Sequence, residues 1–90
     1  MVKDARYTAV QSLITVGKIQ KFSDIFKYIP KTIVARDLGL NYRSFVGKVN
    51  APNRFGVLDI LKLAEYIDCP PGKIFDLIVA DIPTKKKKGQ

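Results

Sequence analysis

The sequence predicts an all-α fold, a compact bundle of five to six short helices formed by a chain of 90 residues. Apolar residues recur at spacings of three and four along most of the chain, which places them on one face of a helix. No stretch alternates apolar and polar residues for long enough to indicate a strand. Glycine or proline separates the successive helical segments. With 47% hydrophobic residues, the chain is expected to form a single domain over residues 1–84.

Two helices are predicted in the N-terminal third of the chain. The first covers residues 5–16, and Asp4 is a suitable N-cap because its carboxylate can accept a hydrogen bond from the helix amides. The second is a two-turn helix, DIFKYI at residues 24–29, with Ser23 as its cap. Pro30 ends this helix, since proline disfavours helical geometry in the preceding residue.

The central segment predicts two helices joined by a turn of about three residues. The first begins at residue 31 or 32 and ends at residue 38, where Gly39 marks its C-terminus. Asn41 is suited to cap a new helix over residues 42–50.

Two more helices are predicted in the C-terminal part, after a loop that contains proline and asparagine. The first begins near Gly56, and Asp59 occupies its first turn, where a carboxylate favours the positive end of the helix dipole. Its predicted inner face consists of Val57, Ile60, Leu61, Ala64 and Ile67. The last helix, residues 72–82, follows two prolines and is predicted to bury Ile74, Phe75, Leu77 and Ile78. Residues 85–90 are expected to form a disordered basic tail, because they have nothing apolar to pack.

The positive charge is unevenly distributed along the chain. The totals are 16 Lys and Arg against 8 Asp and Glu, for a net charge of +8. Residues 31–54 contain five basic residues and one acidic residue, whereas residues 55–84 contain two basic and five acidic residues. Residues 1–30 contain five basic and two acidic residues, and the run Lys85 to Lys88 adds four lysines. Because a polyanion is attracted by clustered charge, residues 31–54 are the candidate binding segment.

The composition excludes several classes of chemistry. The chain has no histidine, which rules out a histidine base and a Ser/His/Asp triad. Its one cysteine, Cys69, allows neither an intrachain disulfide nor a cysteine-based metal site. We therefore expect no enzymatic activity, no metal and no cofactor, and no small-molecule substrate is evident. No apolar run reaches the ~20 residues that span a bilayer, so we expect a cytoplasmic protein without membrane contact.

The stretch KTIVARDLGLNYRSF, residues 31–45, resembles the helix-turn-helix of the Cro and lambda repressor-like family, also called the XRE family. The shared features are small Ala35, Gly39 at the turn and apolar residues that hold the two helices together. The stretch GVLDILKLAEYIDCPPGKIFDLI, residues 56–78, is similar to the two helices that follow in the family. The resemblance covers about residues 23–78 and leaves the N-terminal helix outside the family core. It implies sequence-specific binding of double-stranded DNA and a role in transcription regulation.

The resemblance also implies which side chains contact DNA. Lys31, at the start of the first helix of the motif, would lie near the phosphates, and the start of the second helix would reach the base edges. The family's next contact position falls on Gly47, which has no side chain, and Lys48 stands where the family usually has an apolar core residue. The full set of candidate DNA contacts is Lys31, Thr32, Asn41, Tyr42, Arg43, Ser44, Lys48 and Arg54.

A helical wheel of residues 42–50 ranks these side chains. With Phe45 and Val49 as the buried pair, Arg43 points about 140° away from the inner face and is the best candidate for reading bases. Tyr42 lies only about 40° from the centre of that face, so both packing and DNA contact are open for it. Lys48, about 80° away, suits a phosphate contact, as does Arg54 in the following loop.

Two other functions and two roles of the N-terminal helix remain open. A protein-interaction module, such as an antitoxin or adaptor, could keep the fold without base-specific readout. Non-specific nucleic-acid binding would depend on the net charge and the lysine tail. A homodimer is possible, with residues 5–16 as the dimer element, or this helix could instead cover the domain's own core.

Overall fold

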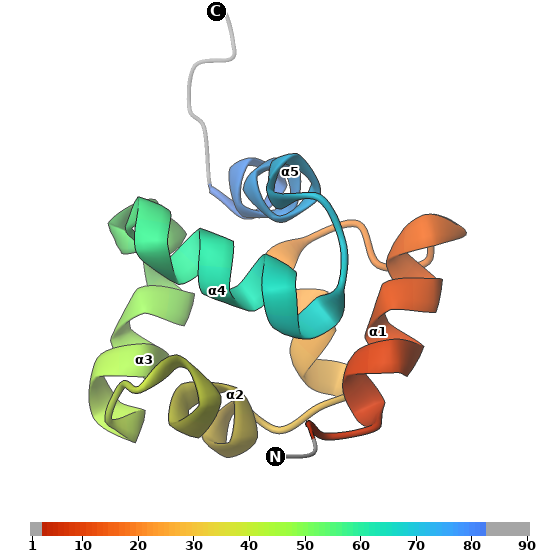
Figure 1. The fold of residues 1–90 in the computed structure, drawn as a ribbon. Helices are drawn as coiled ribbons and strands as arrows, with labels where there is room; N and C mark the ends of the chain where they lie inside the picture. The colour runs from red at the N-terminus through yellow and green to blue at the C-terminus, as the bar shows by residue number, and fades with distance from the viewer. Residues whose placement is uncertain (1–2, 83–90) are drawn as a thin grey trace, which may run out of the picture.

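Five α-helices and two short 3-10 helices (η) make up the protein in a computed structural model that describes residues 3–82 (Figure 1). No strand occurs within these residues. The predicted all-α fold is therefore confirmed, while the predicted tail at 85–90 lies outside the described range. The elements are α1 (Arg6–Thr15), η1 (Phe22–Lys27), α2 (Lys31–Leu38), α3 (Tyr42–Asn50), η2 (Pro52–Arg54), α4 (Val57–Ile67) and α5 (Pro71–Asp81).

Every α-helix contributes two or three residues to one hydrophobic core. Figure 1 shows α4 running across the molecule between α3 and α1, with α5 packed against it. Isolated helices of 8–11 residues are marginal in water, so burial against these neighbours must stabilise them. The α-helical core residues are Tyr7, Val10, Ile14, Val34, Ala35, Leu38, Phe45, Val49, Leu63, Ala64, Ile67, Ile74, Leu77 and Ile78.

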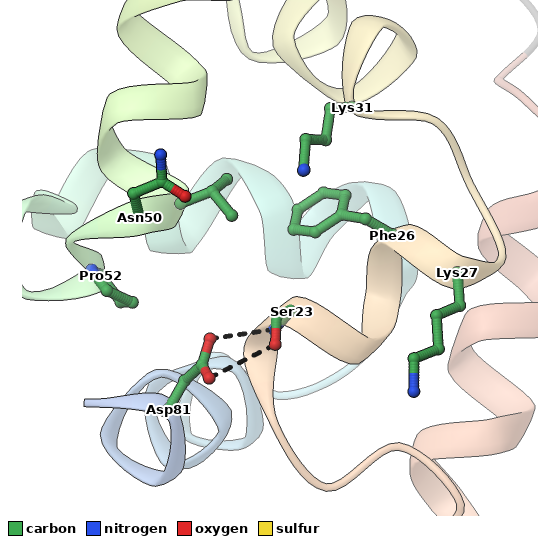
Figure 2. A pocket seen from close by; sticks show the side chains of 8 residues that line it. Ser23, Phe26, Lys27, Lys31, Asn50, Pro52 and Asp81 are labelled. Carbon is green, nitrogen blue, oxygen red and sulfur yellow. Dashed lines mark hydrogen bonds between the residues drawn. The ribbon is translucent and has the colours of Figure 1, made fainter. Parts of the chain in front are cut away.

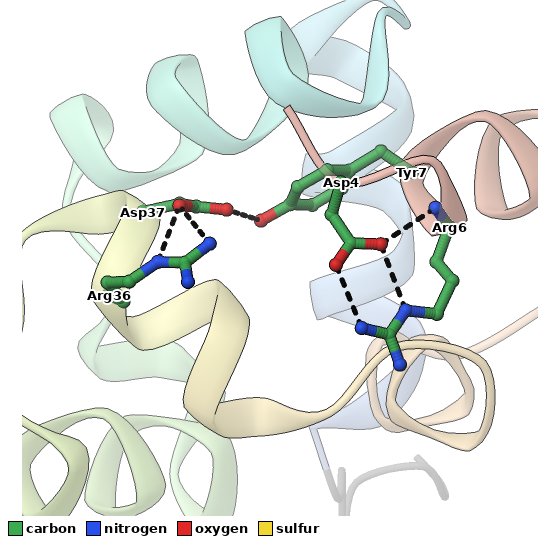
Figure 3. Close-up of polar contacts among 5 residues, drawn as sticks. All are labelled: Asp4, Arg6, Tyr7, Arg36 and Asp37. Carbon is green, nitrogen blue, oxygen red and sulfur yellow. Dashed lines mark hydrogen bonds and ion pairs between the residues drawn. The ribbon is translucent and has the colours of Figure 1, made fainter. Parts of the chain in front are cut away.

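The N-terminal helix covers the domain's own core, which was one of the two roles expected for it. The apolar side of α1 is buried, and the Tyr7 ring lies 5.4 Å from the Tyr66 ring. The Tyr7 hydroxyl donates a 2.7 Å hydrogen bond to Asp37 of α2 (Figure 3). Burial, together with this bond and the charge of Asp37, raises the pKa of Tyr7 above its ordinary value, so the hydroxyl stays protonated. The buried side of α1 therefore packs against the other helices of the same domain.

Two predicted N-caps lie one or two residues away from the N-caps in the structure. The N-cap of α1 is Ala5, while the Asp4 carboxylate accepts a hydrogen bond from the backbone N of Arg6. The second helix is η1, which begins at Phe22, ahead of the predicted start. Its first turn is closed by the Asp24 carboxylate, which accepts from Gln20 N and Lys21 N.

Ser23, the predicted cap of this helix, instead makes a tertiary contact. Its backbone N and its hydroxyl both donate to the carboxylate of Asp81 at the end of α5. The partner is 58 residues away in the chain, so local sequence spacing could not identify it.

The predicted turn between α2 and α3 is confirmed in detail. Gly39 adopts a left-handed conformation with φ of 74°, and the next amide, Leu40 N, donates back to Ala35 O at 2.9 Å. Asn41 caps α3 by accepting a 2.8 Å hydrogen bond from Ser44 N. These local interactions fix where α2 ends and α3 begins.

Three residues predicted to be buried in the last two helices are exposed. Val57, Leu61 and Phe75 retain 72%, 46% and 55% of their accessible surface. The apolar arc of each helix is wider than the strip that contacts the core, and the positions at the centre of that strip are filled by other side chains.

Replacing Tyr7 with phenylalanine tests how strongly α1 is held to α2. We expect Tyr7→Phe to lower the free energy of unfolding by about 1–2 kcal/mol, because Asp37 loses a hydrogen bond to its carboxylate. Urea unfolding measures the change. The matched control is Tyr66→Phe, since the Tyr66 hydroxyl makes no hydrogen bond among the described residues, and equal effects of the two variants would contradict the assigned role.

Alanine substitutions at two glycines distinguish the effect of backbone strain at a positive φ from the effect of filling open space. At Gly39 the positive φ makes alanine unfavourable, and we expect Gly39→Ala to cost about 1 kcal/mol. Gly47 lies within α3 with open space around the added methyl group, so Gly47→Ala should stabilise the fold by about 0.5–1 kcal/mol. Thermal unfolding of both variants checks the opposite signs, and destabilisation by both would mean that α3 is misplaced.

Candidate nucleic-acid interface

The first turn of α3 is a polar surface exposed to solvent. Asn41, Tyr42, Arg43 and Ser44 are all exposed, and Tyr42 retains 51% of its accessible surface. The alternative in which Tyr42 packs in the core is therefore wrong. Phe45, which is fully buried, is the aromatic residue of this turn that packs into the core.

Four phenylalanine rings hold α3 in place, and we call them the phenylalanine cluster. Phe45 of α3 lies 5.6 Å from Phe26 of η1 and 6.0 Å from Phe55, which follows η2. Phe22 completes the ring of contacts, at 5.5 Å from Phe26 and 4.9 Å from Phe55. All four pairs are edge-to-face, the arrangement that aromatic quadrupoles favour.

At the start of α2, Thr32 is exposed and Lys31 is partly buried. The Lys31 ammonium lies 6.0 Å from the centre of the Phe26 ring, on the wall of a cavity of about 420 Å³ (Figure 2). Val49 and Asn50, at the end of α3, line the same cavity. Lys31 therefore lies beside the C-terminal end of α3, about 12 Å along its axis from the first turn.

This cavity was not predicted, because its walls come from separate parts of the chain. Besides Lys31 and the end of α3, it is lined by residues of η1, by Pro52 and by Asp81 of α5. Figure 2 shows Asp81, which is hydrogen-bonded to Ser23, on one side of the cavity, and Lys31 on another side. None of these positions has a spacing relation in the sequence that could have indicated the cavity.

Lys48 is held in an ion pair that joins α3 to α4. Its ammonium lies 2.7 Å from the carboxylate of Asp59, and the two side chains are only 25% and 15% exposed. Asp59 also accepts a hydrogen bond from Gly56 N and so caps α4. The prediction of a phosphate contact at Lys48 is untested, but such a contact would compete with this pair.

The same pair shifts the pKa of Asp59. Partial burial opposes ionisation, but the hydrogen bonds from Lys48 and Gly56 and the positive charge of Lys48 outweigh it. The pKa of Asp59 is therefore below its ordinary value. A carboxyl with a lowered folded-state pKa stabilises the fold above its unfolded-state pKa, and this contribution is lost as the pH falls through the folded-state pKa.

The remaining charges around α2 and α3 are basic. Arg43 and Arg54 are exposed and make no ion pair among residues 3–82. Asp37, the one carboxylate of residues 31–54, is 10% exposed and is bonded to Tyr7 and Arg36 (Figure 3). The exposed surface of this segment therefore presents positive charge without an accessible acid.

Two other kinds of site were sought among the described residues. In that range no group of three or more acidic or cysteine side chains is placed to hold a metal ion. No helix within residues 3–82 combines the length and the apolar character that a membrane span requires.

Acid titration tests the pair between α3 and α4. We expect Asp59→Asn to be less stable than the parent protein at pH 7 and to lose less stability between pH 5 and pH 3, because the missing carboxylate cannot be protonated. The slope should be reduced but not abolished, since Asp4 and Asp24 also have lowered pKa values. Urea unfolding across this pH range gives the comparison.

The matched control for this titration is Asp76→Asn, which replaces an exposed carboxylate that makes no ion pair among residues 3–82. It should leave both the stability at pH 7 and the slope unchanged. A slope for Asp59→Asn equal to that of the parent would show that the pair does not form in solution.

Comparison of the chain with protein-family models, with curated proteins and with solved structures gives no match. The likeness to the lambda repressor-like family therefore depends on the residues of the sequence alone. The structure supports the all-α fold, the exposed first turn of α3 and the basic surface beside it.

Proposed function

We propose that the protein binds double-stranded DNA in a sequence-specific manner and regulates transcription, with α2 and α3 as a helix-turn-helix of the lambda repressor-like (XRE) type. One observation carries the proposal. A nine-residue helix, anchored in the core through Phe45 and Val49, presents a polar first turn to solvent in the most basic part of the described residues. A helix exposed in this way can enter the major groove and read base edges.

Within the first turn, each exposed side chain has a suitable chemistry. Arg43 has a guanidinium that can bond two acceptors on guanine. The Asn41 oxygen is used in the cap, but its amide NH₂ remains available to donate to a phosphate. Tyr42 and Ser44 supply hydroxyl groups to bases or to the backbone.

The backbone contacts fall to residues outside the first turn. We assign the phosphate contacts to Lys31, Thr32 and Arg54, whose basic and hydroxyl groups suit phosphates; such contacts position the protein without reading sequence. Lys48 contributes indirectly to DNA binding, because its ion pair with Asp59 fixes the orientation of α3 against α4. A homodimer would present two such helices about 34 Å apart, and it would form through a surface other than the buried side of α1.

A protein-interaction module without base readout is the second candidate, and two observations favour it. Gly47 offers no side chain one turn beyond Arg43, and Lys48 is engaged with Asp59. The side chains available for base contact are therefore confined to the first turn of α3. Selection of binding sites from random DNA separates the candidates, because only the first predicts an enriched motif.

Substitution of Arg43 tests base reading on the motif that selection yields. We expect Arg43→Ala to weaken binding to this motif by about 1–3 kcal/mol and to leave binding to random DNA nearly unchanged. Arg43→Lys, which keeps the charge but loses the two-donor geometry, should weaken the same complex nearly as much. Fluorescence anisotropy with both DNAs measures these differences.

The control for the Arg43 variants is Lys31→Ala, which removes a predicted phosphate contact. It should weaken binding to both DNAs equally and reduce the slope of log affinity against log salt by about one. If Arg43→Ala behaves in the same way, base readout by Arg43 is refuted. If selection enriches no motif, the interaction module replaces the proposed function.

A further inference from the structure

Five large apolar side chains on α4 and α5 are exposed to solvent. Val57, Leu58 and Leu61 retain 72%, 71% and 46% of their accessible surface, and Phe75 and Val79 retain 55% and 47%. We call these five residues the α4–α5 apolar face. Exposed apolar residues that occur singly are ordinary, whereas a grouped set indicates an interaction surface.

The spacing of the five residues groups them on each helix. Leu61 follows Val57 by four residues and Leu58 by three, and Val79 follows Phe75 by four, so each set shares one side of its helix. On both helices this side lies about 120° round from the residues that are buried in the core. The two helices pack against each other, so the two sets occupy neighbouring elements.

Two exposed carboxylates stand beside this face. Glu65 follows Leu61 by four residues and Asp76 precedes Val79 by three, so each carboxylate stands next to an apolar member of the face. Both are exposed and form no ion pair among residues 3–82. Two basic residues are also near: Lys62 follows Leu58 by four residues, and the Lys3 ammonium donates to the backbone oxygen of Tyr66 at 2.8 Å.

We propose that the α4–α5 apolar face binds an amphipathic helix of a partner protein whose apolar stripe is bordered by lysine or arginine. The five apolar side chains supply the area buried in such a helix-on-helix contact. Glu65 and Asp76 supply the charge that selects a basic border over an acidic one. The partner is thus defined by an apolar stripe and a positive rim.

A second copy of this chain is a poorer occupant for the same face. Face-to-face pairing would bring the exposed carboxylates Glu65 and Asp76 of both molecules into or beside one contact, which carries no matching positive rim. Each molecule also carries a net charge of +8, which opposes self-association.

The inference goes beyond the proposed DNA binding and does not depend on it. Figure 1 shows α5 on the side of the molecule opposite to the α2–α3 turn. A partner on the α4–α5 apolar face would leave the first turn of α3 accessible, so DNA and partner could be bound together.

Two labelled peptides of about 18 residues test the proposal, each with leucines at helical spacing on one side. One has lysines at the remaining positions, and the other has glutamates there. Fluorescence anisotropy at about 0.15 M salt measures their binding to the full chain. We expect the lysine peptide to bind at least about tenfold more tightly, although the net charge of the protein favours the glutamate peptide.

Variants locate the binding surface. Leu58→Ser and Phe75→Ser should each weaken the lysine peptide by about fivefold or more, and Glu65→Lys with Asp76→Lys should remove its advantage over the glutamate peptide. The matched control is Val16→Ser, at a side chain that is 65% exposed after α1, and it should have no effect. Because all these positions are exposed, circular dichroism should report an unchanged fold.

Three results would overturn the proposal. The first is equal binding of both peptides, and the second is binding that survives Leu58→Ser and Phe75→Ser. The third is a dimer in sedimentation that these two variants dissociate, since a second copy would then be the occupant. No DNA is present in any arm, so failure here leaves the proposed DNA binding to its own test.

Discussion

The phenylalanine cluster is the constraint on which the placement of the candidate interface depends. Its four rings come from η1, α3 and the segment after η2, and Phe45 is the one member that lies on α3. Nine residues are too few to form a stable helix alone, so α3 takes its orientation from Phe45, Val49 and the pair between Lys48 and Asp59. Any change that moves these rings moves Arg43, although no ring belongs to the exposed surface that would meet DNA.

Internal pairing of acidic groups produces the charge pattern of the surface. Asp37 is bonded to Tyr7 and Arg36, and Asp59 is bonded to Lys48, so neither carboxylate is free to oppose the basic residues around α2 and α3. On α4 and α5 the exposed acids have no such partners among the described residues. The segment around α2 and α3 therefore exposes basic residues, whereas α4 and α5 expose apolar side chains with carboxylates beside them.

Much of the fold could be predicted because it depends on short-range interactions. Gly39, Asn41 and Asp59 act on amides within a few residues of themselves, so their positions in the sequence were sufficient to place the ends of α2, α3 and α4. The cap also places the first turn of α3 in the sequence, but its exposure depends on the packing of neighbouring elements. Tyr42 was left open because a helical wheel gives a direction but does not tell whether a neighbouring element already fills the space.

The sequence by itself determined the approximate positions of the five α-helices, the turn between α2 and α3 and the concentration of positive charge at residues 31–54, because each depends on local propensity or on composition. Only the tertiary structure decided the partners of Ser23 and Lys48, the cavity beside Lys31 and the exposure of Val57, Leu61 and Phe75. The physical reason is the same in each case. Hydrophobic periodicity states which side of a helix is apolar, whereas packing against distant segments decides how much of that side is covered.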